Sequence, residues 1–428
     1  MGKRLTQLFE RIANFQALHQ AAERAIRGKR GKPGAAAFMA KRERELLKLE
    51  DELRSGRWRP GRYVVIEVKD PKPRRVSAAP FCDRVVHHAV HAAIAPPIER
   101  SFIDDSYANR VGLGSHRAVR RFEHYRDRHR HVLRCDIWRY FPAIDHAILK
   151  ADYRRRIACP DTLRVLDAIV DGSNEQEPVE LYFPGDDLFA PFARRRGLPI
   201  GNLTSQFFAN LYLDGFDHFV KEVLRAPYLR YVDDFALFDD DPAVLEAWRG
   251  RIARYLEGRR LRLHPRKTFV APTRETARFL GYELLGNGSR RLPEDKLRRF
   301  RNRLRGLRDR WRAGTVTEME VRQRVQSWIA HAAQADTVRL RHALFEGGWF
   351  DPFVPAAPEP DGPPVGRVLR GGSWNNTPQN TRSANRNRNE AANRNNNTGL
   401  RLASTGPEAG AGGRTRPPGV RRAVHGPS

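Results

Sequence analysis

Two adjacent aspartates, Asp233 and Asp234, stand between short apolar segments in residues 229–238, whose sequence is LRYVDDFALF. β-Branched and aromatic residues on either side of a carboxylate pair predict two short strands with the acids at their turn. Neighbouring carboxylates repel each other, so a chain that presents them together usually gives them a cation. Hard ions such as Mg²⁺ take oxygen ligands of this kind. For the pair taken alone, a solvated turn is the alternative.

A third carboxylate and a glycine loop lie upstream of this hairpin. Asp136 falls in a strand-like segment, residues 131–141. Residues 197–211 form a glycine-bearing loop that runs into an amphipathic helix. The order of acid strand, glycine loop with helix, and acid hairpin resembles the palm of reverse transcriptases. The resemblance extends over residues 60–340 and is more specific than any of its parts.

The resemblance implies an α+β fold: a right-hand polymerase with fingers, a palm of antiparallel sheet backed by helices, and a helical thumb. The expected parts are an N-terminal helical region, fingers with palm, a thumb and a disordered tail, at 1–60, 61–288, 289–348 and 349–428. Within the first part, apolar spacing predicts helices over 5–26 and 37–55.

By the same resemblance, the three aspartates and the backbone carbonyl of Ile137 would bind two Mg²⁺ ions, with Mn²⁺ as a substitute. One ion would activate the primer 3′-hydroxyl and the other would neutralise the triphosphate. Lys267 matches a lysine that can protonate the departing pyrophosphate. A simple phosphate contact by this lysine is the equal alternative.

Several residues match positions that hold the incoming nucleotide. Arg74 fits the arginine that grips the triphosphate, with Arg75 as the second choice, because a guanidinium suits phosphate oxygens. Either arginine could instead be surface charge. Phe141 matches an aromatic gate that excludes a 2′-hydroxyl, and core packing is its alternative. The glycine loop adds Ile200, Gly201, Ser205 and Gln206.

The glycine loop departs from the usual pattern. Many reverse transcriptases have Gln before this glycine and Ser-Pro four residues after it, whereas this chain has Ile200 and Ser205-Gln206. Isoleucine cannot hydrogen-bond at the minor-groove edge of a base pair. The pattern resembles the reverse transcriptases of diversity-generating retroelements, which copy template adenines inaccurately. The link from Ile200 to infidelity is a hypothesis.

The charge of the chain predicts a polyanionic partner. The 78 Lys and Arg residues give a net charge of +28, which favours nucleic acid. Residues 294–312 predict an amphipathic helix whose eight arginines are expected to face one way and hold duplex backbone. The predicted nucleic-acid contacts are Arg110 in a second fingers motif, Gly281 in a primer-grip-like turn, and Arg298, Arg301 and Arg305.

Composition also bears on location. The three cysteines show no metal-like spacing, so reduced thiols are expected. Neither an 18-residue apolar run nor a signal-peptide core is found, which predicts a cytoplasmic protein without a membrane partner. The resemblance adds that it is encoded by a bacterium or a phage.

The sequence changes character at residue 351, where a proline-rich segment begins. Ten of the 23 residues from 375 to 397 are Asn. Residues 370–402 resemble the variable end of retroelement target proteins, which have C-type-lectin-like or formylglycine-enzyme-like folds. Because Asn has adenine-rich codons, the tail is expected to be translated template repeat. A ligand-binding appendage and generic low-complexity sequence are the alternatives.

The expected partners are template RNA, primer and cDNA, dNTPs, and, by resemblance, a small basic accessory variability protein. Two other functions stay open at this point. One is a faithful reverse transcriptase of the retron or group II intron type. The other is a catalytically inactive RNA-binding protein.

Overall fold

The computed structural model describes residues 4–68, 74–174, 176, 181–346, 348–350, 352, 367–369 and 387–389. The expectation of a disordered tail falls almost wholly outside these residues. Within the tail, β10 (Arg367–Leu369) pairs antiparallel with β11 (Asn387–Asn389). No helix among the described residues is long and apolar enough to cross a membrane. All three cysteines are free thiols.

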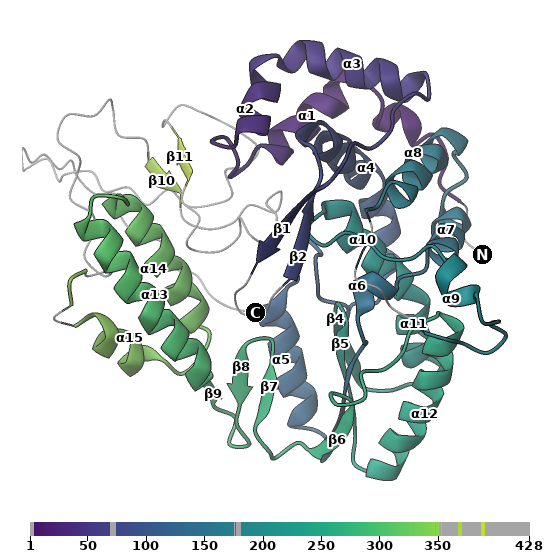
Figure 1. The fold of residues 1–428 in the computed structure, drawn as a ribbon. Helices are drawn as coiled ribbons and strands as arrows, with labels where there is room; N and C mark the ends of the chain where they lie inside the picture. The colour runs from purple at the N-terminus through teal and green to yellow at the C-terminus, as the bar shows by residue number, and fades with distance from the viewer. Residues whose placement is uncertain are drawn as a thin grey trace, which may run out of the picture.

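The centre of the molecule is a four-stranded antiparallel sheet in the order β4-β5-β3-β6. Its strands are β3 (His131–Asp136), β4 (Tyr228–Tyr231), β5 (Asp234–Asp239) and β6 (Phe269–Pro272). Side chains alternate between the two faces of a strand. Both faces are covered, by α12 (Pro242–Gly258) on one side and α5 (Ser115–Arg126) on the other (Figure 1).

The sequence of the strands explains this double burial. Leu133 and Phe235 join the core on the α12 side, whereas Val132 and Phe238 join the core on the α5 side. Successive positions of each strand are therefore apolar on both faces, as in sheets that lie between two layers. The acids stand where this apolar pattern stops, at one end of β3 and β5.

A helical layer adjoins the α12 side of the sheet. Its members are α1 (Phe15–Ala25), α2 (Pro33–Ala40), α3 (Arg42–Arg54), α4 (Phe81–Glu99), α7 (His146–Arg156), α8 (Pro160–Asp171) and α10 (Leu203–Tyr212). The helix expected over 5–26 is shorter, because Asn14 caps α1 by accepting from the Ala17 N–H. The helix expected over 37–55 is two helices, which meet at Lys41.

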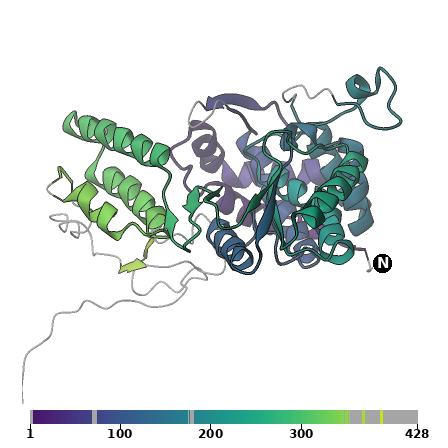
Figure 2. The ribbon, with the colours of Figure 1, turned by 90° about the horizontal axis from the view of Figure 1, so that it is seen from below.

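Two smaller sheets and a helical bundle complete the fold. The hairpin β1 (Val64–Val68) and β2 (Arg74–Ala78) has every residue of β1 exposed. A second sheet contains β7 (Ala277–Phe279), β8 (Tyr282–Leu284) and β9 (Arg290–Arg291). Beyond it, α13 (Glu294–Arg312), α14 (Glu318–Ala332) and α15 (Val338–Phe345) form a bundle set apart from the rest (Figures 1 and 2). The expected α+β class with antiparallel sheets is confirmed.

We expect acid to destabilise the helical layer through α4. Burial lowers the pKa of His87, His88 and His91 to about 4, 3 and 4, so all three are neutral in the folded chain at pH 7. In the unfolded chain they titrate near 6.5. The free energy of unfolding should therefore fall by up to about 1.4 kcal/mol per pH unit for each histidine between pH 6.5 and 4.

Denaturant unfolding at pH 7 and pH 5 measures this effect. His91→Gln should make the decrease shallower, whereas the same substitution at the exposed His342 should leave it unchanged. Equal slopes for the two variants would contradict the assignment.

Candidate active site and nucleic-acid groove

The acid hairpin forms as the sequence predicts. Tyr231 pairs with Asp234 across β4 and β5, leaving Val232 and Asp233 as the turn. Val232 has φ +63°, and it is the only β-branched residue with a positive φ in the described part of the chain. Backbone strain of this kind costs on the order of 1–3 kcal/mol and persists only where the surroundings enforce it.

The register of β3 and β5 brings the third acid to the hairpin. Asp136 is the ladder partner of Asp234, and the Ile137 N–H donates to the carbonyl of Asp233 at 3.1 Å. Directly opposed residues of an antiparallel pair have Cβ atoms about 5 Å apart. All three acids thus lie at the same end of the sheet, although Asp136 is 97 residues from Asp233 in sequence.

Electrostatics at this end of the sheet favour a bound cation. Burial raises the pKa of Asp234 to about 7, and Asp233 and Asp136 push it the same way, while Arg134 and Lys267 oppose the shift. The Lys267 Nζ lies 2.8 Å from Asp136 Oδ2 and supplies part of the missing positive charge. Carboxylates that repel one another, one of them with a raised pKa, form a donor set that suits a hard divalent ion.

The side chains are not arranged as a finished metal site. Within the described residues, no three or more His, Cys, Asp or Glu side chains form a group that could hold a metal ion. Asp136 is instead engaged with Lys267. The backbone brings the three acids together. For Asp136 to bind a metal ion, its carboxylate would have to release the hydrogen bond from Lys267. Ile137 is buried at the end of β3.

The glycine loop is fastened to the β1–β2 hairpin. The Ile200 carbonyl accepts from the Ser77 N–H at 2.9 Å, and Asn202 Nδ2 donates to the Ser77 carbonyl at 3.1 Å. Gly201 has φ +114°, and a Cβ there would lie 2.8 Å from Val76 Cγ1. Only glycine allows this approach. The glycine loop and the β1–β2 hairpin, which are both predicted to bind the incoming nucleotide, are therefore in direct contact.

Not every predicted nucleotide contact lies at an accessible surface. Ser205 is 3% exposed inside α10, whereas Ile200 and Gln206 are half-buried. Phe141 is half-buried too and meets Tyr140 edge-on, so the gate and the core role both remain compatible with its position.

The two candidate arginines of the hairpin both lie in β2. Arg74 pairs with Val68 through the backbone, and its side chain is outside the described part. Arg75 is exposed.

Two predicted nucleic-acid contacts, Arg110 and Gly281, lie in loops. Arg110 donates through Nη1 to the carbonyls of Ile103 and Ser106, at 2.6 and 2.9 Å, and through Nη2 to that of Glu99. It therefore fastens its own loop, and its contact with template stays a prediction. Gly281 occupies a tight turn with φ +98°, where a Cβ would lie 2.4 Å from Lys296 Nζ.

The eight arginines of α13 do not face one way, so that expectation is wrong. The buried residues Leu297, Phe300 and Leu307 form one stripe. At 100° per residue, the arginines form two rows that flank this stripe. One row contains Arg298, Arg301, Arg305, Arg308 and Arg312; the other contains Arg299, Arg303 and Arg310.

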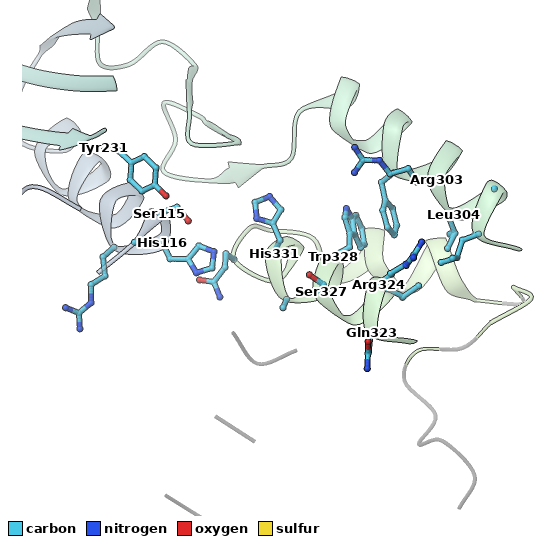
Figure 3. Close-up of a pocket in the computed structure, with 18 of the residues that line it drawn as sticks. Ser115, His116, Tyr231, Arg303, Leu304, Gln323, Arg324, Ser327, Trp328 and His331 are labelled. Carbon is cyan, nitrogen blue, oxygen red and sulfur yellow. The ribbon is translucent and has the colours of Figure 1, made fainter. Parts of the chain in front are cut away.

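Arg303 and Arg310 of the second row line a cavity of about 1260 Å³ between the bundle and the sheet. Tyr231, next to the acids, lies at one end, and Ser115 and His116 of α5 lie beside it (Figure 3). Its cationic lining consists of Arg117, Arg120, Arg303, Arg310 and Arg324. The signal by which this row could be found is the spacing of Arg303 and Arg310, which are seven residues apart and therefore lie on one helix face.

A basic groove that reaches Tyr231, next to the acid hairpin, is suited to a nucleic-acid backbone. We expect Arg303→Ala/Arg310→Ala to weaken binding of an RNA–DNA duplex and to reduce the steepness of log K against log[salt] by about 2, because each phosphate contact contributes about 0.9. Fluorescence anisotropy at several salt concentrations measures both quantities.

The matched control is Arg298→Ala/Arg305→Ala, the same substitution on the other row of the same helix. It should leave the slope near the wild-type value. If Arg298→Ala/Arg305→Ala reduces the slope and Arg303→Ala/Arg310→Ala does not, the duplex lies against the first row of arginines, as the sequence predicts.

We further expect Asp234→Asn to remove stabilisation by Mg²⁺ without destabilising the metal-free protein, because the neutral amide relieves carboxylate repulsion. Wild-type protein should gain about 1.4 kcal/mol at an Mg²⁺ concentration about ten times its Kd. Thermal unfolding with and without Mg²⁺ measures both effects. Asp239→Asn, at the other end of β5, should keep the Mg²⁺ effect. Full Mg²⁺ stabilisation of Asp234→Asn would rule out this carboxylate as a ligand.

Comparison with known proteins places this geometry in a family. The model described as reverse transcriptase (RNA-dependent DNA polymerase) matches residues 66–284. A second model, a sulfatase-modifying factor enzyme 1-like domain, matches residues 308–405, beginning inside α13 and ending in the tail.

Among individual proteins, the chain is similar to Protein YkfC of Escherichia coli (strain K12). The two are 27% identical over 312 residues, which cover 61% of this chain and 79% of that protein. Two telomerase structures are also similar, one from Candida albicans in complex with a fragment of telomeric RNA and one of apo telomerase from Candida tropicalis, truncated from its C-terminal domain. Their identities are 13% and 12% and their TM-scores 0.38 and 0.40. The matches cover 56% and 54% of this chain but only 47% and 55% of the telomerase chains, about half of each.

Because the reverse transcriptase match spans just over half of the chain and contains all three acids, the protein belongs to the reverse transcriptase family of RNA-directed DNA polymerases.

Proposed function

We propose that this reverse transcriptase makes adenine-mutagenised cDNA from a template-repeat RNA, as part of a diversity-generating retroelement that diversifies a target gene. The observation that carries the proposal is the second family match, to a sulfatase-modifying factor enzyme 1-like domain over residues 308–405. Its second half covers the Asn-rich tail, where ten of 23 residues are Asn. A target-type sequence joined to a polymerase is what translated template repeat would give.

The glycine loop offers a physical cause for errors at adenine. Ile200 presents an apolar side chain next to Gly201, and its carbonyl is held by the Ser77 N–H. A side chain without donors or acceptors cannot test the hydrogen-bonding edge of a base pair. Selection at this position would then rest on shape alone, which discriminates weakly between pairs of similar size.

Reverse transcriptase domains generally use divalent metal ions, and we propose two Mg²⁺ ions, with Mn²⁺ as a substitute. Asp136, Asp233, Asp234 and the carbonyl of Ile137 would hold them. When bound, the ions would activate the primer hydroxyl and neutralise phosphate charge. Lys267, already within 2.8 Å of Asp136, would be released toward the triphosphate. There it would donate a proton to pyrophosphate or hold a phosphate oxygen.

The remaining residues would position the substrates. Arg74 or Arg75 of β2 would hold the triphosphate, and Phe141 would exclude a ribose 2′-hydroxyl. Reverse transcriptases bind template RNA and other nucleic acid, and we assign the duplex to the groove of Figure 3. We also propose residues 61–288 as fingers and palm and 289–348 as thumb, preceded by a helical region and followed by a tail without a role as protein.

A small basic accessory protein would act with this chain, in the cytoplasm of a bacterium or of a phage-infected cell. The alternative function is faithful copying, as in retron or group II intron reverse transcriptases. That alternative predicts an error spectrum without adenine bias.

Sequencing cDNA copied from a defined RNA template with Mg²⁺ and dNTPs separates the two functions. We expect errors to concentrate opposite template adenines. Ile200→Gln should lower the adenine error frequency several-fold, up to about tenfold, because one added hydrogen bond is worth about 0.5–1.5 kcal/mol. A uniform error spectrum in the wild type would support the faithful alternative.

The control for this substitution is Leu188→Gln, which introduces the same side chain at an exposed apolar position ahead of the loop. It should leave the error spectrum unchanged. If Ile200→Gln also keeps the adenine errors of the wild type, Ile200 is not their cause.

A further inference from the structure

Arg230, the residue before Tyr231 in β4, has a guanidinium completely enclosed by protein. Its side chain and that of Asp217 in α11 (Asp214–His218) are each 1% exposed. Nε donates to Asp217 Oδ1 at 2.7 Å and Nη2 donates to Oδ2 at 2.5 Å, which makes a bidentate ion pair. Burial alone would lower the pKa of Arg230, but Asp217 raises it above its ordinary value, so the guanidinium remains charged.

The other donors of this guanidinium reach three further segments. Nη1 donates to the Val232 carbonyl at 2.9 Å and to Asn210 Oδ1 at 3.3 Å. Nη2 also donates to Ser106 Oγ at 3.0 Å. An arginine side chain has five N–H donors in a fixed plane, and these contacts use all five. A lysine, with three donors at a single point, could not reproduce them.

The contact with Val232 is the one that bears on the site. Val232 is held at φ +63°, and its carbonyl belongs to the peptide that continues into Asp233. A β-branched residue leaves this conformation unless its surroundings prevent it. Relaxation of Val232 would rotate that peptide and carry the Asp233 carboxylate away from Asp136 and Asp234. A buried charge that donates to the carbonyl opposes the rotation.

The backbone of Arg230 fastens the same residue to the chain that precedes α5. Its N–H donates to the Asp105 carbonyl at 2.9 Å, and its carbonyl accepts from the Tyr107 N–H at 3.0 Å. Asn210 of α10 donates to the Ala108 carbonyl at 2.8 Å. One residue thus ties the acid hairpin to the helix that follows the glycine loop and to the segment that leads to the groove.

We propose that Arg230 is a positioning residue that holds the strained turn of the acid hairpin, and with it Asp233, in the geometry that catalysis requires. The inference rests on the proposed role of the three acids in nucleotide transfer. The Arg230–Asp217 pair therefore acts on the rate of chemistry and not only on folding.

Arg230→Lys tests the proposal, because it keeps the charge and the pairing with Asp217 but cannot retain all five hydrogen bonds. We expect kcat for single-nucleotide extension to fall about 100-fold, as a displacement of about 1 Å at a reacting group can cause. KM for dNTP and Kd for the duplex should stay within about threefold of wild type. Hydrogen–deuterium exchange of the amides of residues 231–235 should rise several-fold, up to about tenfold.

The matched control is Arg259→Lys. Arg259 also pairs with a largely buried aspartate, Asp152, and donates to the Tyr212 carbonyl, but it has no contact with the acid hairpin among its hydrogen bonds. It should lower the melting temperature without the selective loss of kcat. If the two variants lose kcat equally, or if exchange at residues 231–235 is unchanged in Arg230→Lys, the proposal is wrong.

A second variant separates positioning from stability. Arg230→Met/Asp217→Leu removes both buried charges together, which often restores or increases stability. We expect a melting temperature near that of wild type, a kcat still about 100-fold low, and fast exchange at residues 231–235. Recovery of kcat together with stability would show a merely structural role and overturn the proposal. A wild-type protein without polymerase activity would refute the proposed function, and the exchange measurement would still decide whether Arg230 holds the turn.

Discussion

The pairing of β3 with β5 determines where every other part of the site has to be. Asp136 faces Asp234 only in the observed register, and a slip of one residue would turn each side chain of the strand to the opposite face. Buried residues on both faces prevent such a slip. Leu133 would move out of the core on the α12 side, and Val132 out of the core on the α5 side. The double-sided core thus also acts as the device that aligns the carboxylates.

Alignment of the carboxylates has a cost in stability that the surroundings offset. Burial raises the pKa of Asp234, Val232 is held in a strained conformation, and Lys267 neutralises part of the charge. A buried carboxyl group and a β-branched residue with a positive φ are both unfavourable, and they occur together at one end of the sheet. Such clustering of unfavourable features is typical of functional sites. Along the rest of β3 and β5, Leu133, Phe235, Val132 and Phe238 are buried apolar side chains that join the cores on the two faces of the sheet.

Much of the fold could be predicted from local patterns. The acid hairpin, the strand of Asp136, the glycine loop and the amphipathic helix at 294–312 all depend on residues that are close in sequence. The apolar spacing does not reveal the break in the helix between Ile12 and Phe15, because it continues through the break. The residue that marks the break is Asn14, which caps the start of α1. The number of arginines in α13 does not predict their direction, because that direction depends on their angular positions around the helix.

Long-range contacts could not be predicted in the same way. Arg110 has the residue type and position of a template contact, yet the carbonyls that bind it come from a fold that the sequence does not display. The partners of Arg230 range from Val232 to Ser106, 124 residues away. Among more than seventy basic residues, nothing in the sequence distinguishes Arg230, whose side chain is completely buried.

The contact between Gly201 and Val76 has a consequence for how the enzyme can change. With the loop backbone hydrogen-bonded to Ser77, the hairpin and the loop form one frame, and neither can shift without the other. On the proposed role of Ile200, variation in base selectivity would be confined to side chains carried by that frame, such as Ile200 itself. If Ile200 sets base selectivity as proposed, a change of this single codon would adjust the accuracy of copying, while the geometry that joins nucleotides would stay the same.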